Sequence, residues 1–290
     1  MLRVELDVEG ESTDMGSLAP LWIELMMRAV VPDVFDEYLA GLHKPRQPEN
    51  GPDTSAVGLA VLRFQRSVRR MWSGKNLAWL AAQAAAGESV GGIIARPSAA
   101  YALYPNVHAN AQINRLGSGM VQLSLRLNGD WLAGEGVAVQ NRLVDALVTI
   151  GEQVDSVYGS IGWQFDNYST ILKYGHNHVW DLDPPGPRGL LRGYDWVTIV
   201  PKELASKING RRADAAFTSL VRLGSGAVVA RACDDFFDYD LPRAHEVMRA
   251  FAPVLPRGVP EYQEQLGVPV PEPPLVCEDP ADYLGDEPRR

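Results

Sequence analysis

The segment RLGSGMVQLSLRL, residues 115–127, joins a glycine-rich turn to a strong strand signal. Apolar side chains occupy every second position after the turn: Val121, Leu123, Leu125 and Leu127. This period of two is typical of a strand with one apolar face. The strand-like run AQINRL precedes the turn, and glycine supplies the positive φ angles that tight hairpin turns require. The segment therefore predicts a β-hairpin.

The same turn occurs a second time in the chain. RLGSGMV at 115–121 recurs as RLGSGAV at 222–228, again between two strand-like runs, AFTSLVRL and AVVARA. Apolar residues with helical spacing follow each turn: Val137, Leu143, Val144, Leu147 and Ile150 after the first, and Leu241, Val247, Met248, Phe251 and Val254 after the second. A hairpin and a helix in the same order twice predict two duplicated ββα units, at about 108–150 and 215–255.

Other elements follow from the same periodicities. Alternating apolar residues predict a strand with one buried face at 2–8. Further strands are expected at 89–95, 157–165 and 195–200, and helices at 18–31, 33–42 and 56–72. The helix at 56–72 is predicted from one stripe of apolar residues: Val57, Val61, Phe64, Val68 and Met71. We therefore expect an α+β fold, an antiparallel sheet with helices packed on it.

Length and composition leave the number of domains open. The 290 residues and 46% hydrophobic composition suffice for a core of ordinary size. The two ββα units could share one sheet or form two lobes, and we favour one compact domain over residues 1–255. Residues 256–290 are rich in proline and acid, which predicts a tail that is extended on the surface or loose in solvent.

The charge balance bears on the choice of partner. The chain has 36 acids, 27 bases and a net charge of -9, with a pI near 5.1. This balance disfavours nucleic acid as a partner and favours a basic protein. Cys233 and Cys277 are too few for a disulfide framework, so we expect a reducing, cytoplasmic compartment. The apolar stretch at 18–31 contains Glu24 and Arg28, and we expect neither a signal peptide nor a membrane span.

A second kind of candidate site lies in HNHVWDLD, residues 176–183. His176, His178, Asp181 and Asp183 belong to the residue types that bind zinc or non-haem iron. No third histidine stands in a related context, so we expect a polar loop, no metal and no cofactor. A metal- or carboxylate-dependent enzyme that uses this region is the alternative.

Four aspartates and three aromatic residues gather in CDDFFDYDLP, residues 233–242. Asp240 is expected to cap the helix that starts at Leu241. Asp234, Asp235 and Asp238 with the neighbouring aromatics would suit a basic protein partner. A solvated loop at the entry to the helix is the alternative.

The segment LLRGYDWVTIVPKEL, residues 190–204, predicts a short strand that turns into a helix at Pro201. Through Gly193, Tyr194, Trp196 and Pro201, and the hairpin and helix that follow, it resembles bacterial immunity proteins of polymorphic toxin and type VI secretion systems. The resemblance spans roughly 90–254 and is nearest to families paired with restriction-nuclease-like toxins.

The resemblance implies a non-catalytic cytoplasmic protein that binds a cognate toxin and blocks it. The candidate partner-binding residues are Asp234, Asp235, Asp238, Tyr239, Trp180, Asp181, Asp183 and Tyr194. A negative charge would suit a cationic nuclease, although steric blocking requires none.

Overall fold

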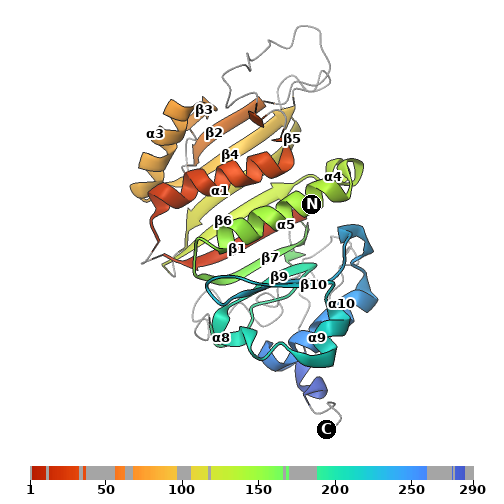
Figure 1. The fold of residues 1–290 in the computed structure, drawn as a ribbon. Coiled ribbons are helices and arrows are strands. Elements are labelled where there is room, and N and C mark those ends of the chain that lie inside the picture. Colours follow the sequence, from red (N-terminus) through yellow and green to blue (C-terminus); the bar gives the residue numbers. More distant parts are fainter. Residues whose placement is uncertain are drawn as a thin grey trace. The chain divides into compact units, whose positions relative to one another are not determined.

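The computed structural model describes residues 2–10, 13–32, 35–36, 56–62, 68–96, 106–116, 119–165, 168–169, 188–259, 276 and 278–284. Contacts divide the chain into two compact units (Figure 1). Unit 1 comprises Met1–Asp7 and Gly151–Arg290, and unit 2 comprises Val8–Ile150. The expectation of one compact domain over 1–255 stays a prediction. The α+β class is confirmed, because antiparallel strand pairs and packed helices occur in both units.

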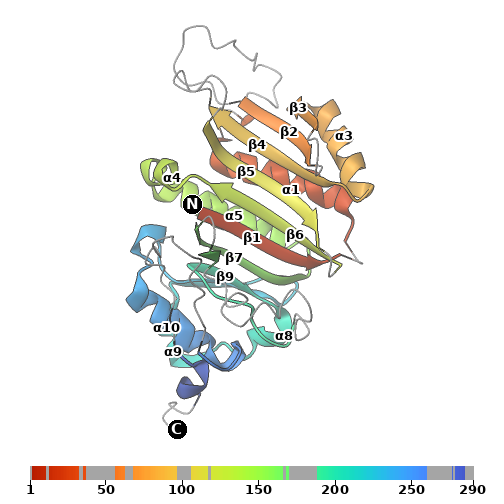
Figure 2. The same cartoon turned by 180° about the vertical axis from the view of Figure 1, so that it is seen from behind.

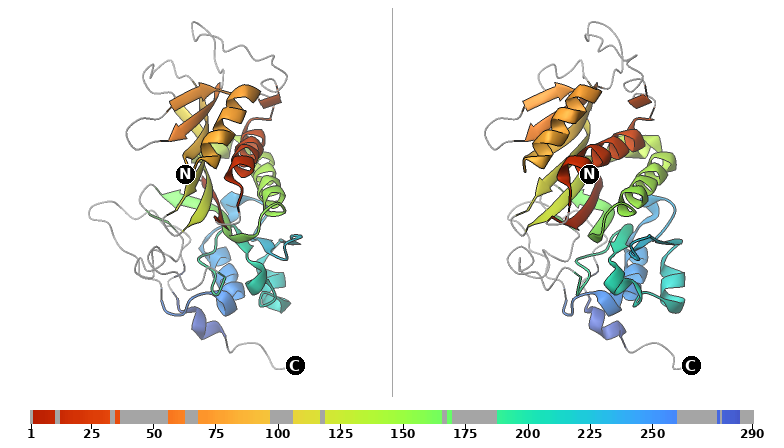
Figure 3. Two further views of the ribbon diagram at one scale, coloured as in Figure 1. Left: turned by 90° about the vertical axis from the view of Figure 1, so that its left-hand side faces the viewer. Right: turned by 60° about the vertical axis from the view of Figure 1, so that its left-hand side comes forward.

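Unit 2 is a sheet with helices on one of its faces. Its strands lie in the order β6 (Met120–Leu127), β5 (Asn106–Arg115), β4 (Ser89–Arg96), β2 (Ala56–Leu62) and β3 (Val68–Met71), with antiparallel pairing throughout. The helices are α1 (Met15–Val30), α3 (Gly74–Ala85), α4 (Gly129–Glu135) and α5 (Val137–Gly151). Helices α1, α3 and α5 lie on one side of these strands, as the turned views in Figure 3 show.

Helix α1 begins where Asp14 caps it and then packs on the sheet through its apolar stripe. The Asp14 carboxylate accepts a hydrogen bond from the Gly16 N–H at 3.0 Å. Trp22 and Ile23 are fully buried. A Cβ built at Gly92 of β4 would lie 2.6 Å from Cγ2 of Ile23, so glycine is required where the helix approaches the strand.

Unit 1 also contains a run of paired strands. Its strands lie in the order β10 (Ser219–Arg222), β11 (Val228–Arg231), β9 (Val197–Val200), β7 (Ser156–Phe165) and β1 (Leu2–Glu9), and β8 (Tyr168–Ser169) pairs with β7. The helices are α8 (Lys202–Ala205), α9 (Gly210–Ala216) and α10 (Leu241–Phe251), with 3-10 turns η1 (Phe236–Asp238), η2 (Ala252–Val254) and η3 (Pro280–Tyr283). Phe217 and Phe251 join α9 to α10, with ring centroids 5.0 Å apart.

The two glycine turns have the same hydrogen bonds, as the sequence repeat suggests. In the first, Leu116 N–H donates to the Met120 carbonyl at 2.7 Å, and Gly119 has φ +81°. In the second, Leu223 N–H donates to the Ala227 carbonyl at 2.9 Å, and Gly226 has φ +90°. Both hairpins are thus confirmed, and α5 and α10 follow them. Duplication of the whole ββα units stays a prediction.

The predicted helix over 56–72 is wrong. This stretch supplies β2 and β3, whose register pairs Gly58 with Met71 and Val61 with Val68. A spacing of three and four residues fits a helix, but the β-branched valines favour strands, and both strands gain partners in the sheet. The helix begins later, where the Ser73 side chain accepts a hydrogen bond from Asn76 N–H at 3.2 Å.

Strand β1 is confirmed, but its expected single buried face is wrong. Glu5 and Asp7 are both 1% exposed, although they alternate with the apolar positions. Arg3 reaches Glu5 at 2.8 Å, and Arg192 reaches Asp7 at 2.7 Å. These ion pairs make it possible to bury carboxylates on the second face of the strand.

Part of the predicted tail is folded. Val276 is buried, and η3 packs near α9 and α10. Arg212 donates a hydrogen bond to the Tyr283 carbonyl at 2.5 Å, and the Arg249 guanidinium lies 5.0 Å from the centre of the Tyr283 ring. Most other residues of the predicted tail, and most of the predicted helix at 33–42, lie outside the described residues.

The remaining predicted elements are confirmed as α1, β4, β7 and β9, with boundaries shifted by a few residues. Within the described part of the chain, no helix has both the length and the apolar character needed to cross a membrane.

Candidate protein-binding surface

The aromatic residues of unit 1 gather at one end of its sheet. The register pairs Ile161 of β7 with Val197 of β9, and Val197 with Arg231 of β11. Trp163, Trp196 and Cys233 lie one or two residues beyond these pairs. The end of β7, the start of β9 and the end of β11 therefore bring distant parts of the chain together.

Phe236 forms the buried centre of this cluster. Its ring centroid lies 4.7 Å from that of Trp163 and 5.5 Å from that of Trp196. Phe237 lies beside Phe236 at 5.4 Å and contacts the edge of Trp163 at 6.1 Å. Tilted and edge-on pairs at these distances stabilise a cluster beyond the burial of apolar area alone.

Hydrogen bonds fix the backbone that follows β11. Trp196 Nε1 donates to the Cys233 carbonyl at 2.7 Å, and Arg231 Nε donates to the same oxygen at 3.0 Å. The Arg231 guanidinium also donates to the Asp234 carbonyl and lies 5.0 Å from the Trp196 ring centre. The loop therefore leaves the sheet in one defined direction.

Two aspartates of the loop have structural roles. Asp235 Oδ1 accepts a hydrogen bond from Phe237 N–H at 3.0 Å and so caps η1. Asp240 Oδ1 accepts one from Arg243 N–H at 2.9 Å, which confirms the predicted cap of α10. Capping occupies these carboxylates, so they have less freedom to contact a partner.

The residues Asp234–Leu241 are named the acidic–aromatic loop. Its exposed side chains include Asp234, Asp238, Phe237 and Leu241, and the last two are 44% and 45% exposed. Two large apolar side chains between carboxylates, held on a rigid base, have the composition of a protein-binding surface. The arrangement can attract a cationic protein and provide it with an apolar contact.

Two predicted partner-binding residues lie in the core. Tyr194 is 4% exposed and Tyr239 is 5% exposed, so neither presents its ring to a partner. Burial, and then the charge of Asp195, raise the pKa of Tyr239 well above its usual value, so its hydroxyl stays protonated. The exposed apolar residues of the loop are instead Phe237 and Leu241. Sequence reasoning missed them because the pattern of the loop does not show which of its adjacent aromatics faces inward.

The predicted residues Trp180, Asp181 and Asp183 lie outside the described residues, as do His176 and His178. Among the residues that the structure does describe, no three or more histidine, cysteine, aspartate or glutamate side chains are grouped so that they could hold a metal ion.

The segment that carries the family resemblance is a buried corner. Every residue of 191–200 is buried. Asp195 N–H donates to Thr198 Oγ1 at 3.0 Å, and Trp196 N–H donates to Asp195 Oδ1 at 3.0 Å. A Cβ at Gly162 would lie 1.6 Å from Asp195 Oδ2, so β7 needs glycine there. The segment thus builds the core beneath the acidic–aromatic loop.

Cys233 is also part of this core. Burial raises the pKa of its thiol to about 11, which keeps the thiol protonated at neutral pH. Cys233 is 7% exposed and packs as a core residue.

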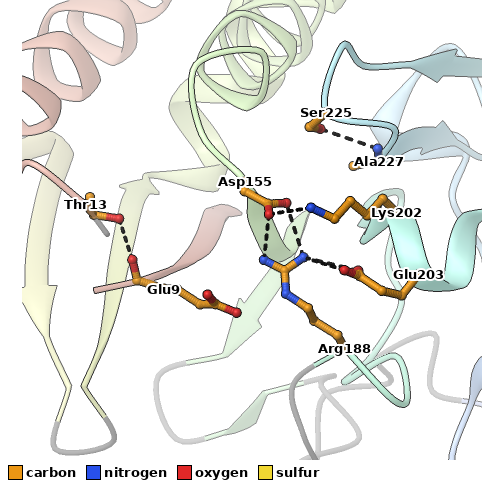
Figure 4. Close-up of polar contacts among 8 residues, drawn as sticks. All are labelled: Glu9, Thr13, Asp155, Arg188, Lys202, Glu203, Ser225 and Ala227. Atoms are coloured by element: carbon orange, nitrogen blue, oxygen red, sulfur yellow. Dashed lines mark hydrogen bonds and ion pairs between the residues drawn. The ribbon is translucent and has the colours of Figure 1, made fainter. Parts of the chain in front are cut away.

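An ion cluster lies at the start of β7 (Figure 4). Asp155 lies 2.7 Å from Lys202 Nζ and 3.0 Å from Arg188 Nη2, and Arg188 also reaches Glu203 at 3.1 Å. Burial opposes ionisation of Asp155, but the hydrogen bonds from Lys202 and Arg188 lower its pKa. Each charge has an opposite charge beside it, so the cluster ties α8 to the start of β7.

Comparisons with known proteins show a likeness of fold. No protein-family model matches the chain, and no curated protein matches it in sequence. Among solved structures, the Pseudomonas aeruginosa type VI secretion system protein PA0821 aligns with a TM-score of 0.56 and 9% sequence identity. The alignment covers 92% of this chain and 76% of that chain. The two proteins therefore share a fold over most of this chain.

Proposed function

We propose that this protein is an immunity protein that binds a cognate secreted toxin and neutralises it by occlusion. The observation that carries the proposal is the acidic–aromatic loop, in which exposed Phe237 stands between exposed Asp234 and Asp238 on a rigid aromatic base. The fold likeness to a type VI secretion system protein supports a role in toxin delivery systems.

The proposed mode of action requires binding and no catalysis. Exposed carboxylates accelerate the encounter with a cationic nuclease and help to select it. Phe237 and Leu241 then lose their contact with water at the interface, and this burial slows dissociation. The protein would act in the cytoplasm without a cofactor, membrane or nucleic acid, and it would block the toxin by covering it.

The test is co-expression with the toxin encoded by the neighbouring gene, followed by measured affinities of purified variants. Phe237→Ala is expected to weaken binding roughly thirtyfold, which corresponds to about 2 kcal/mol for a buried interface anchor. Leu284→Ala is the matched control, because Leu284 is 45% exposed and follows η3, outside the acidic–aromatic loop. The control should bind within about twofold of the wild type.

Two results would count against different parts of the proposal. If cells that contain abundant wild-type protein die when the toxin is expressed, the protein is not its inhibitor. If the wild type protects but Phe237→Ala binds as well as Leu284→Ala, the inhibitor function stands and the loop is not the contact surface.

A further inference from the structure

Strand β10 (Figure 1) ends the run of paired strands in unit 1, and one of its edges faces away from β11. In this hairpin Leu223 N–H donates to the Ala227 carbonyl, and hydrogen-bonded and non-hydrogen-bonded pairs alternate along an antiparallel ladder. Counted from this pair, Leu220 and Arg222 fall at non-hydrogen-bonded positions, so their N–H and C=O groups point away from β11. Within the described part of the chain, no other strand pairs with β10 on that side.

The side chains along this edge are largely apolar and exposed. Leu220 and Val221 are 42% and 39% exposed, and the strand contains neither an acidic residue nor a proline. Its one charged residue, Arg222, donates from Nη1 to the Gly226 carbonyl at 3.4 Å, within its own turn. An exposed apolar edge is a template for pairing with another strand, and proteins protect an edge that they do not use with charges, bulges or covering segments. Strand β10 therefore has the features of an edge that pairs.

Strand β3 of unit 2 shows how the same chain protects an edge (Figure 2). Arg69 and Arg70 are both exposed on it, and the Arg70 guanidinium lies 4.0 Å from the centre of the Trp79 ring. Asn76 Nδ2 donates to the Met71 carbonyl at 2.8 Å and so occupies one acceptor of the strand. Adjacent arginines disfavour edge pairing with a second copy, because they bring like charges together. Strand β10 presents no such barrier.

We propose that β10 pairs antiparallel with β10 of a second copy of this chain, about a twofold axis at Val221. In this register Leu220 of each copy lies opposite Arg222 of the other, and their outward peptide groups exchange hydrogen bonds. Val221 then faces its own copy at a non-hydrogen-bonded position, where two β-branched side chains pack closely. The contact is self-complementary, as twofold symmetry requires, and places no like charges directly opposite each other. It involves no toxin, so it is independent of the proposed function.

The size of the contact and the charge of the chain set the expected strength of the dimer. One short strand covers less area than the interface of a stable dimer, so association should be weak. The net charge of -9 also makes two copies repel each other. Salt screens this repulsion but leaves the apolar and backbone contacts, so association should strengthen as ionic strength rises. A contact that depended on opposite charges would weaken instead.

Sedimentation velocity of the full-length protein measures the association. The wild type should shift from monomer toward dimer as its concentration rises to about 300 µM, and more strongly at high salt. Val221→Lys and Val221→Glu should each be monomeric, because each places like charges opposite each other at the axis. An equal mixture of these two variants should dimerise again, since opposite charges then face each other. Leu284→Lys is the matched control and should dimerise like the wild type, because Leu284 is similarly exposed but lies outside β10.

A second variant covers the case in which the Val221 substitutions unfold the protein, which thermal unfolding would show. Leu220→Pro removes an outward N–H without breaking the ladder to β11, and it should also be monomeric. A wild type that stays monomeric over the whole range would overturn the proposal. A mixture of the lysine and glutamate variants that stays monomeric would overturn it too, as would Val221→Lys dimers as strong as those of Leu284→Lys. If the wild type is monomeric and Val221→Lys alone loses affinity for the toxin, the edge binds the toxin and not a second copy.

Discussion

At the scale of single residues, Asp7 and Arg192 form a buried ion pair 2.7 Å long, with side chains 1% and 8% exposed. Removal of the cation leaves a carboxylate inside the protein, and this costs far more than the pair itself contributes. Arg192→Met should therefore lower the free energy of unfolding by about 3 kcal/mol or more. Urea denaturation followed by tryptophan fluorescence measures this change.

The control for Arg192→Met is an exposed pair in the same unit. Arg243 and Glu246 are 2.6 Å apart on α10, with side chains 34% and 50% exposed. Arg243→Met should cost about 0.5 kcal/mol, because solvent screens an exposed pair. Equal losses in the two variants would contradict the view that burial makes the Asp7–Arg192 pair important.

Asp155 gives a prediction on pH dependence. Because the pKa of Asp155 lies below its usual 3.8 in the folded protein, its ionised form stabilises that state at higher pH, and the stabilisation is lost as pH falls through the lowered pKa. Asp155→Asn should be slightly less stable than the wild type at pH 7, and the difference should shrink below about pH 4. Urea midpoints of both proteins over this range test the sign. Asp214→Asn on exposed α9 is the charge-matched control, and a stability difference that is independent of pH would contradict the prediction.

Residue types alone could not identify the exposed members of the candidate site. Phe236 and Phe237 are adjacent and identical in type, yet the first is fully buried and the second is 44% exposed. The difference arises because Phe236 packs against both Trp163 and Trp196, which are far away in sequence, whereas Phe237 contacts the edge of Trp163. Glu5 and Asp7 were likewise expected on a solvent-exposed face of the strand. The local pattern could not show that Arg192, distant in the chain, pairs with Asp7.

At the scale of elements, the hairpin turns depend on glycine at one position. Gly119 and Gly226 occupy equivalent places in the two turns and have φ +81° and +90°. Side chains with a Cβ are strained in this region. Gly226→Ala and Gly119→Ala should each lower the free energy of unfolding by about 1–2 kcal/mol.

Gly134 supplies the control for these substitutions. It lies in α4, and a Cβ built there meets nothing within 4 Å. Gly134→Ala should be neutral or stabilise the protein by about 0.5–1 kcal/mol, because alanine favours helix. If Gly226→Ala behaved like Gly134→Ala, the shared turn geometry would not explain the sequence repeat.

Elements with strong local signals could be predicted, and elements set by pairing could not. The period of two and the glycine turns correctly predicted both hairpins, and Asp240 correctly predicted the start of α10. In contrast, the apolar spacing over 56–72 fits a helix and also fits two strands. Pairing with β4 favours strands, because β2 pairs with β4 along its whole length, from Ala56 with Ala95 to Leu62 with Ser89.

At the scale of the whole molecule, the charged side chains behind the net charge of -9 are unevenly distributed. The acidic–aromatic loop of unit 1 exposes the carboxylates of Asp234 and Asp238, whereas strands of unit 2 expose Arg69 and Arg126. Net charge, which is all that composition provides, does not show this local distribution.

The last prediction separates local charge from net charge in the encounter with the toxin. The double variant Asp234→Asn, Asp238→Asn should associate several-fold more slowly at low salt, because both carboxylates are exposed on the acidic–aromatic loop. Its association rate should also depend less on ionic strength, while its dissociation rate changes little. Stopped-flow measurements over a range of salt concentrations test this.

The control for the last prediction carries the same net charge. Asp145→Asn with Asp214→Asn removes two exposed carboxylates from α5 and α9, neither of which is part of the loop. If the loop steers the toxin, this variant should associate nearly as fast as the wild type, because the field of exposed charges falls off within about 8–10 Å at moderate salt. Equal slowing in both variants would mean that the charge of the whole molecule attracts the toxin, and the position of the carboxylates beside Phe237 would then have no special role in recognition.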